Sequence, residues 1–157
     1  QVSIAFNTWV RRGALNVRCN IRFNYMLVEF FGKVKDQVIN AIVVQLCEQD
    51  TVLVEQLQAH IDRLKASAVH VQRTDGVSWL ARQAPQSWDV VFIDPPFESQ
   101  LFQPALKAAA LSVKYDGWIY LEAPKKWNDN ELSALGLQTY RYLKAGNLHA
   151  HLLQRIA

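Results

Sequence analysis

From residue 41 onward, apolar runs alternate along the chain with stretches in which apolar residues recur at helical spacing. The apolar runs have the length of buried strands. They cover residues 41–48, 68–73, 88–94 and 117–124. The intervening stretches predict helices at 51–67, 77–83, 99–113 and 128–136. Strands that alternate with helices in this way are typical of parallel β-α-β units in an α/β fold.

The two ends of the chain have different patterns. Residues 137–156 predict two strands joined by a hairpin turn at 145–147. Residues 1–17 alternate apolar and polar positions around a basic turn, which predicts an N-terminal hairpin extension. Between the hairpin and residue 41, we expect a strand at 25–30 and a short helix at 33–40. Residues 1–157 contain no repeat or long linker, and we expect one domain.

Composition narrows the class of protein only moderately. Half of the residues are apolar, and the net charge of +3 with a pI near 9.0 permits a nucleic-acid partner without requiring one. Two cysteines, Cys19 and Cys47, make no disulfide framework and indicate a reducing compartment. No apolar run is long enough for a membrane span, and no signal-peptide pattern begins the sequence. We therefore expect a cytoplasmic protein without a membrane partner.

Acidic residues stand at or just after the ends of several predicted strands. They are Glu48, Asp75, Asp94 and Glu122. In an open α/β sheet, the ligand crevice lies outside the carboxyl ends of the strands, so at least three of these carboxylates could line it. Glu48 fits either a ribose-binding acid or a solvated acid at a helix start. Asp75 fits either a ligand for an amine or the N-cap of the next helix, with Gly76 easing the turn.

The segment WDVVFIDPPFESQ joins a buried strand to a rigid turn. Pro95 and Pro96 fix the backbone and remove two N–H donors, which leaves Asp94 and the Pro95 carbonyl as converging acceptors. Phe97 adds a flat apolar face. A planar amino group would satisfy both acceptors and stack on the ring. The alternative is a rigid turn that carries a surface acid.

These residues resemble a known family. DPPF after an apolar strand resembles the D/N-P-P-Y/F signature of amino-group methyltransferases that use S-adenosylmethionine. Most of residues 41–157 resemble, in order, the bacterial 16S rRNA guanine-N2 methyltransferases of the RsmD type. The matching segments are LCEQD, TDGVSWL, WDVVFIDPPF, GWIYLE and GNLHAHLLQR. The resemblance implies a doubly wound, Rossmann-like sheet, mostly parallel, with an antiparallel hairpin at the C-terminal end.

The resemblance also implies a place for S-adenosylmethionine. Glu48 would bind the ribose, and Asp75 with Gly76 would bind the adenine end. The family carries a glycine-rich loop after its first strand, whereas this chain contains no G-x-G. Only Phe30 and Gly32 match that loop, which is therefore degenerate or missing here.

The substrate side of the resemblance is 16S rRNA, free or in the small ribosomal subunit. Asp94 and the Pro95 carbonyl would hold the guanine amine, Pro96 would fix the turn, and Phe97 would stack on the base. The opening segment resembles the family's N-terminal hairpin, which is thought to touch RNA. Candidate RNA contacts are Trp9, Arg11, Arg12, Lys125 and Lys126. For the lysine pair, which precedes Trp127, a solvated loop is the alternative.

Other functions remain open at this point. An adenine-N6 DNA methyltransferase shares the D-P-P motif but normally brings a target-recognition domain, for which 157 residues leave no room. A glutamine-N5 protein methyltransferase prefers Asn where this chain has Asp94. A non-catalytic RNA-binding protein of the same fold would explain the missing glycines. His149 and His151 share a strand face, but we expect no metal site and a monomer.

Overall fold

The computed structural model describes residues 3–8 and 43–157, and within them seven strands form one sheet. Their order across the sheet is β3-β2-β1-β4-β5-β7-β6. The strands are β1 (Ser3–Thr8), β2 (Val43–Glu48), β3 (Val69–Arg73), β4 (Trp88–Asp94), β5 (Val113–Ala123), β6 (Leu137–Ala145) and β7 (Leu148–Arg155).

The direction of pairing changes once across this sheet. Strands β3, β2, β1, β4 and β5 are parallel, whereas β7 runs antiparallel to both β5 and β6. Strand order reverses between β1 and β4, which makes their carboxyl ends the topological switch point of the sheet. The predicted doubly wound, mostly parallel α/β fold with a closing antiparallel hairpin is confirmed.

Strand β1 corrects one prediction. Its backbone pairs in parallel with β2 on one side and β4 on the other, so Ser3–Thr8 is the central strand of the sheet. A strand that has neighbours on both edges cannot be half of a separate hairpin, and the prediction of an N-terminal hairpin extension over 1–17 is wrong for this segment. The expected strand at 25–30 and helix at 33–40 lie outside the described residues.

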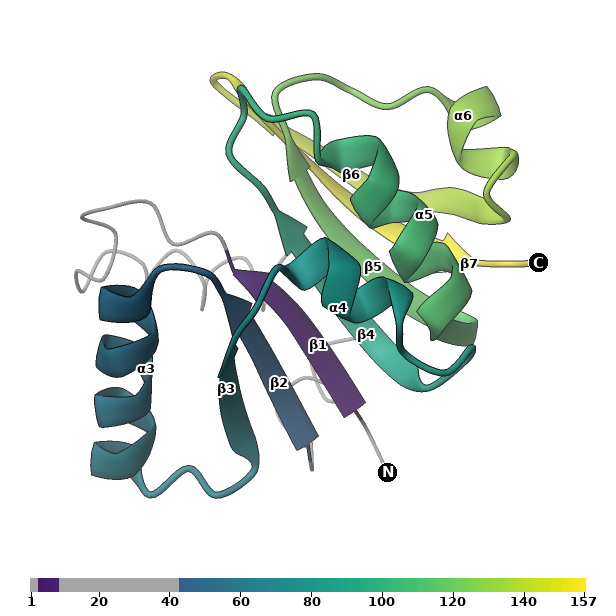
Figure 1. The fold of residues 1–157 in the computed structure, drawn as a ribbon. Helices are drawn as coiled ribbons and strands as arrows, with labels where there is room; N and C mark the ends of the chain where they lie inside the picture. Colours follow the sequence, from purple (N-terminus) through teal and green to yellow (C-terminus); the bar gives the residue numbers. More distant parts are fainter. Residues whose placement is uncertain (1–2, 9–42) are drawn as a thin grey trace.

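The helices lie where the sequence predicts them, with slightly shorter bounds. They are α3 (Thr51–Leu64), α4 (Gly76–Ala81), α5 (Phe102–Ser112) and α6 (Asp129–Ser133). In Figure 1, α4 and α5 lie in front of β4 and β5, while α3 lies beside β3. Among the described residues, no helix combines the length and apolar character needed to cross a membrane.

The core is built on the middle of the sheet. One face of β4, β5 and β7 packs against the small side chains of α5. This face carries Val91, Ile93, Ile119, Leu121 and Leu153. The opposite face is buried as well, with Val90, Phe92, Trp118, Tyr120 and Leu152 each at most 7% exposed. Burial on both faces explains the near-continuous apolar runs of β4 and β5 and gives their ends a rigid base.

Candidate functional site

Two acidic side chains flank the end of the central strand. In the sheet register, Thr8 of β1 pairs with Asp94 at the end of β4. On the other side of β1, Asn7 pairs with Cys47, and Glu48 is the next residue of β2. Two strand spacings therefore separate Glu48 from Asp94, roughly 10 Å. The switch point, where the ligand crevice is expected, therefore has one carboxylate on each side of β1.

Glu48 is buried, with 5% of its surface exposed. Its Oε1 accepts hydrogen bonds from the backbone N–H groups of Gln49 at 2.7 Å and Asp50 at 2.8 Å. Its Oε2 is buried and has no hydrogen-bond partner among the described residues. The alternative of a solvated acid at a helix start is wrong, because Asp50 caps α3 instead. A buried acceptor without a partner suits a hydroxyl donor such as a ribose diol.

Asp75 is the N-cap of α4, which confirms one of its two predicted roles. Its Oδ1 accepts the backbone N–H of Ser78 at 2.7 Å. Its Oδ2 accepts a 2.7 Å hydrogen bond from Nε2 of Gln49, which ties the end of β2 to the start of α4. Gly76, the first residue of α4, is buried. Contact between Asp75 or Gly76 and an adenine ring stays a prediction.

The DPPF segment forms a turn immediately after β4. Asp94 is half-buried, Pro95 is buried and Pro96 is exposed. The Pro96 carbonyl accepts the Ser99 N–H at 2.9 Å and closes the turn. Within the described part of the chain, no backbone N–H donates a hydrogen bond to the Pro95 carbonyl. The Asp94 carboxylate, the Pro95 carbonyl and the partly exposed ring of Phe97 remain a candidate site for an amino group.

Glu122 lies near the carboxyl end of β5, at the same end of the sheet as Asp94. It follows Leu121, which pairs with Ile93 just before Asp94, so the two acids occupy neighbouring positions at adjacent strand ends. The hydroxyl of Tyr120 donates a 2.7 Å hydrogen bond to Oε1 of Glu122. Glu122 is one of the strand-end acids of the sequence for which no role was predicted. The Y-x-E spacing, which places both side chains on one strand face, was the available signal.

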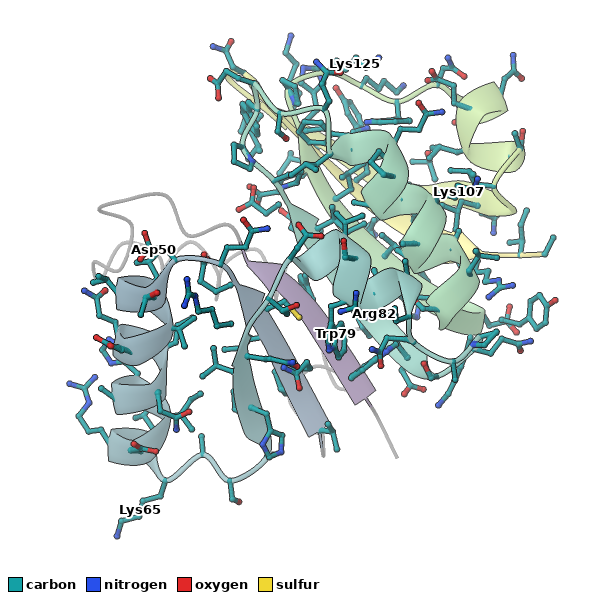
Figure 2. All side chains as sticks on the ribbon, in the orientation of Figure 1. Asp50, Lys65, Trp79, Arg82, Lys107 and Lys125 are labelled. Atoms are coloured by element: carbon teal, nitrogen blue, oxygen red, sulfur yellow. The ribbon has the colours of Figure 1, made fainter. Side chains whose placement is uncertain are left out.

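The loop after β5 presents two exposed lysines, Lys125 and Lys126. The Lys125 Nζ lies 5.5 Å from the ring centre of Trp127, and the Lys126 Nζ lies 4.9 Å from that of Tyr142. Trp127 is only 6% exposed, so its ring is not available to stack on a base. Figure 2 shows Lys125 at the top of the view and Lys65, at the end of α3, at the bottom.

The two histidines of β7 have different environments. His151 is fully buried, and its Nε2 accepts the backbone N–H of Trp127 at 3.1 Å. Burial lowers the pKa of His151 below the usual range of histidine. The ring of His149 is joined through Nδ1 to the Tyr142 hydroxyl at 2.7 Å. In residues 3–8 and 43–157, no three His, Cys, Asp or Glu side chains are grouped as metal ligands.

Five predicted site residues lie outside the described residues. They are Trp9, Arg11, Arg12, Phe30 and Gly32. Of the remaining predicted residues, Glu48, Asp75 and Asp94 are brought to one edge of the sheet by β2, the start of α4, and β4.

Comparison with known families gives one match that spans most of the chain. The model of the family described as "Conserved hypothetical protein 95" matches residues 40–154. This range includes Glu48, Asp75, the DPPF turn and Glu122.

Comparison with individual proteins gives matches at lower identity. "Ribosomal RNA small subunit methyltransferase D" from Buchnera aphidicola is 29% identical over 72 residues, which are 45% of this chain and 38% of that protein. A structure named as a methylase from Haemophilus influenzae superposes with a TM-score of 0.66 at 20% identity, covering 89% of this chain and 97% of that one. A methyltransferase structure from Escherichia coli has a TM-score of 0.66 at 22% identity, with coverages of 89% and 85%. These structures support the fold.

Proposed function

This chain belongs to the Conserved hypothetical protein 95 family, the RsmD-type family that the ordered motifs indicate, and from this premise we propose that it methylates the exocyclic N2 amine of a guanine in 16S rRNA. The methyl donor in this proposal is S-adenosylmethionine. The matched segment spans 38% of the curated relative, whose name specifies small-subunit rRNA, so substrate and activity are inferences for this chain.

One observation carries the proposal: the unpaired, buried Oε2 of Glu48 and the Asp94 of the DPPF turn stand on opposite sides of β1. Glu48 would accept the ribose hydroxyls of the cofactor at Oε2. Asp75 and Gly76, at the start of α4, would contact the adenine end. When bound, S-adenosylmethionine supplies an electrophilic methyl group. The hydrogen-bond acceptors at this end of the sheet therefore fit S-adenosylmethionine.

The DPPF turn would hold the amine that receives the methyl group. Asp94 and the Pro95 carbonyl would accept the two N–H groups of N2, which fixes the direction of its lone pair. Phe97 would stack on the base, which must leave any helix to enter the crevice. Asp94 would take up the proton that N2 loses as its new bond to carbon forms. Orientation of the amine supplies most of the rate enhancement in this scheme.

RNA outside the crevice would contact basic side chains. Lys125 and Lys126 are exposed, and both extend from the loop after β5, beside the strand edge that carries Asp94. Their ammonium groups suit phosphate oxygens, which position an RNA without reading its sequence. Trp9, Arg11 and Arg12 are proposed as further RNA contacts on the strength of the family resemblance alone.

A second function is favoured by one observation. The chain contains no G-x-G, although glycines after the first strand let a backbone approach the cofactor closely in this family. A methyltransferase fold that binds RNA without the cofactor would have this feature. Cofactor binding separates the two functions, because methyl transfer cannot occur without it.

The test combines binding and turnover. Calorimetric titration of S-adenosylhomocysteine into the protein should give a dissociation constant in the micromolar range. Incubation with unmethylated small-subunit rRNA and S-adenosylmethionine should then yield N2-methylguanosine, detected and mapped by mass spectrometry of nuclease fragments. Asp94→Ala should lower the rate by roughly 100-fold or more, while its S-adenosylhomocysteine affinity is retained. Asp62→Asn, on the exposed side of α3, is the matched control and should leave the rate unchanged.

Two results would contradict the enzyme. Absence of binding in the titration would leave the RNA-binding function. Binding without N2-methylguanosine, on naked rRNA and on assembled subunits, would reject guanine in 16S rRNA as the substrate.

A further inference from the structure

We propose that Glu122 selects guanine over other amino-bearing groups by accepting the N1–H of the base while the DPPF turn holds its N2 amine. This inference rests on the proposed function and adds a specificity-determining residue to it. It assigns a role to a carboxylate at the strand edge that neither the cofactor contacts nor the amine contacts use.

The sheet register sets Glu122 beside Asp94. Ile93 pairs with Leu121, and both side chains lie in the core on the face covered by α5. The next residue of each strand points to the opposite face, because side chains alternate along a strand. Asp94 and Glu122 therefore project from the same face at neighbouring strand ends, with their Cα atoms about 5 Å apart.

A hydrogen bond from Tyr120 holds the side chain of Glu122 in place. Tyr120, two residues earlier on the same face, donates its hydroxyl hydrogen bond to Oε1 of Glu122 at 2.7 Å. The Tyr120 ring is 3% exposed and packs against Phe92 with ring centres 5.7 Å apart. Phe92 in turn lies two residues before Asp94 on β4. The packed ring pair thus positions the Tyr120 hydroxyl, which fixes the carboxylate of Glu122 through one oxygen.

The number of acceptors matches the donors of guanine. The Watson–Crick edge of guanine carries three N–H bonds, two on N2 and one on N1. Asp94 and the Pro95 carbonyl would accept the first two, and Glu122 would accept the third. A carboxylate that faces N1–H forms a charge-assisted hydrogen bond, which is about twice as strong as a neutral one.

The same carboxylate would reject adenine. The amine of adenine stands beside N1, which has a lone pair and no hydrogen, so a carboxylate placed there meets another acceptor. Repulsion of this kind discriminates between partners as effectively as attraction. A glutamine side-chain amide has no N–H equivalent to N1–H of guanine, so it would leave Glu122 unpaired. Guanine is the only one of these three amines that satisfies all three acceptors.

The experiment compares bases at one position of the RNA. The guanosine mapped by the turnover assay is replaced, through splinted ligation of the rRNA transcript, with 2-aminopurine or with adenine. 2-Aminopurine keeps the N2 amine but lacks N1–H. We expect the wild-type protein to methylate the guanine RNA roughly 10- to 100-fold faster, in kcat/KM, than the 2-aminopurine RNA.

Variants at Glu122 and Tyr120 should change this ratio. Glu122→Gln can turn its amide N–H toward an N1 lone pair, so the guanine to 2-aminopurine ratio should fall about tenfold and methylation of adenine should rise. Tyr120→Phe keeps the ring on Phe92 but releases Oε1, and should lower the same ratio by a smaller factor. Glu55→Gln, on the exposed surface of α3, is the matched control and should leave the ratio unchanged.

The outcomes separate this inference from the proposed function. An unchanged guanine to 2-aminopurine ratio in Glu122→Gln and Tyr120→Phe, with an active wild-type protein, would overturn the role of Glu122 alone. A wild-type protein that methylates no guanine RNA would overturn both. If both variants lose rate equally on every base, with the ratio kept, Glu122 has a structural role and the inference is wrong.

Discussion

The side-chain amide of Gln49 donates a 2.7 Å hydrogen bond to Asp75, so the residue after β2 is tied to the N-cap of α4. Asp75 therefore has a structural role that must be separated from any role in cofactor binding. Its Oδ1 caps the Ser78 N–H, and loss of such a cap costs about 1 kcal/mol. The two roles make different demands on the side chain, because a short hydroxyl can cap a helix but cannot reach as far as a carboxylate.

We expect Asp75→Ala to lower both the free energy of unfolding, by about 1 kcal/mol, and the affinity for S-adenosylhomocysteine. Asp75→Ser should restore most of the stability without restoring the affinity, since serine is a good N-cap. Urea unfolding and calorimetric titration measure the two effects. Full recovery of affinity in Asp75→Ser would mean that Asp75 acts only by capping α4.

Glu48→Gln should weaken cofactor binding with little effect on the fold. Glutamine keeps an acceptor for the Gln49 and Asp50 N–H groups but replaces the unpaired Oε2 with an NH₂ group. Loss of a charge-assisted hydrogen bond to ribose should raise the dissociation constant of S-adenosylhomocysteine roughly tenfold or more. The melting temperature of the ligand-free protein, followed by circular dichroism, should change little. Equal affinities for the variant and the wild-type protein would remove Glu48 from the cofactor site.

The buried His151 should make the protein less stable in mild acid. Burial lowers its pKa in the folded state, so the unfolded chain binds a proton more readily. By linkage, stability falls as pH drops below the unfolded pKa of about 6.5 and continues to fall toward the folded pKa. Protonation also removes the Nε2 lone pair that accepts the Trp127 N–H.

His151→Gln keeps an acceptor for Trp127 and does not titrate. The slope of unfolding free energy against pH, measured with urea between about pH 7.5 and about pH 5, should therefore be smaller in this variant than in the wild-type protein. His70→Gln, at an exposed position of β3, should retain the wild-type slope. Identical slopes in all three proteins would show that His151 does not control this range.

Cys47 should resist alkylation as long as the protein is folded. The thiol is 3% exposed, and burial, with a smaller contribution from the negative charge of Asp75, raises its pKa to about 12. The thiolate is the reactive form, so its population in the folded protein is lower by roughly a factor of a thousand than in an ordinary cysteine. Mass spectrometry of the Cys47 peptide after iodoacetamide treatment, with and without urea, measures the difference. Similar rates in both conditions would be inconsistent with a buried thiol.

Lys125 and Lys126 should contribute to RNA binding through phosphate contacts. The double variant Lys125→Ala/Lys126→Ala should bind small-subunit rRNA more weakly, and the slope of log affinity against log salt should shrink by about 1 to 2. The control variant Arg82→Ala/Lys107→Ala removes two exposed cations. Arg82 lies next to α4 and Lys107 lies on α5 (Figure 2). This control should keep the wild-type slope, and a slope that changes equally in both double variants would indicate only a general charge effect.

The sequence predicted those strands and helices whose hydrophobic pattern lies within the segment itself. β2, β4 and α3 lie within a few residues of their expected positions, because an apolar run or a helical stripe is visible within each segment. The DPPF turn followed from proline chemistry alone. The alternative roles of Asp75 were both stated in advance, since N-cap residues and ligand-binding acids are the same residue types.

Features that depend on distant partners were not predictable in this way. The alternation of Ser3–Thr8 indicates a strand but does not say with which strands it pairs. Trp127 follows two exposed lysines in sequence, yet its burial is decided by His151 of β7 and by the core. The start of β5 was missed because Lys114, Tyr115 and Asp116 resemble a turn, and Asp116 does have a positive φ of 60°.

The position of β1 has a consequence for how the protein folds. β1 is the first of the described strands in sequence order, but Ile4 pairs with Val44 on one side and with Val90 on the other. The chain loses conformational entropy when it closes both intervening segments, before these distant pairings contribute any stability. Folding is therefore slow, and strands that form early have unpaired edges. On a ribosome, the central strand would wait without its β4 neighbour until residue 94 has been synthesised, so the end of the sheet that carries Glu48 and Asp94 cannot assemble before that point.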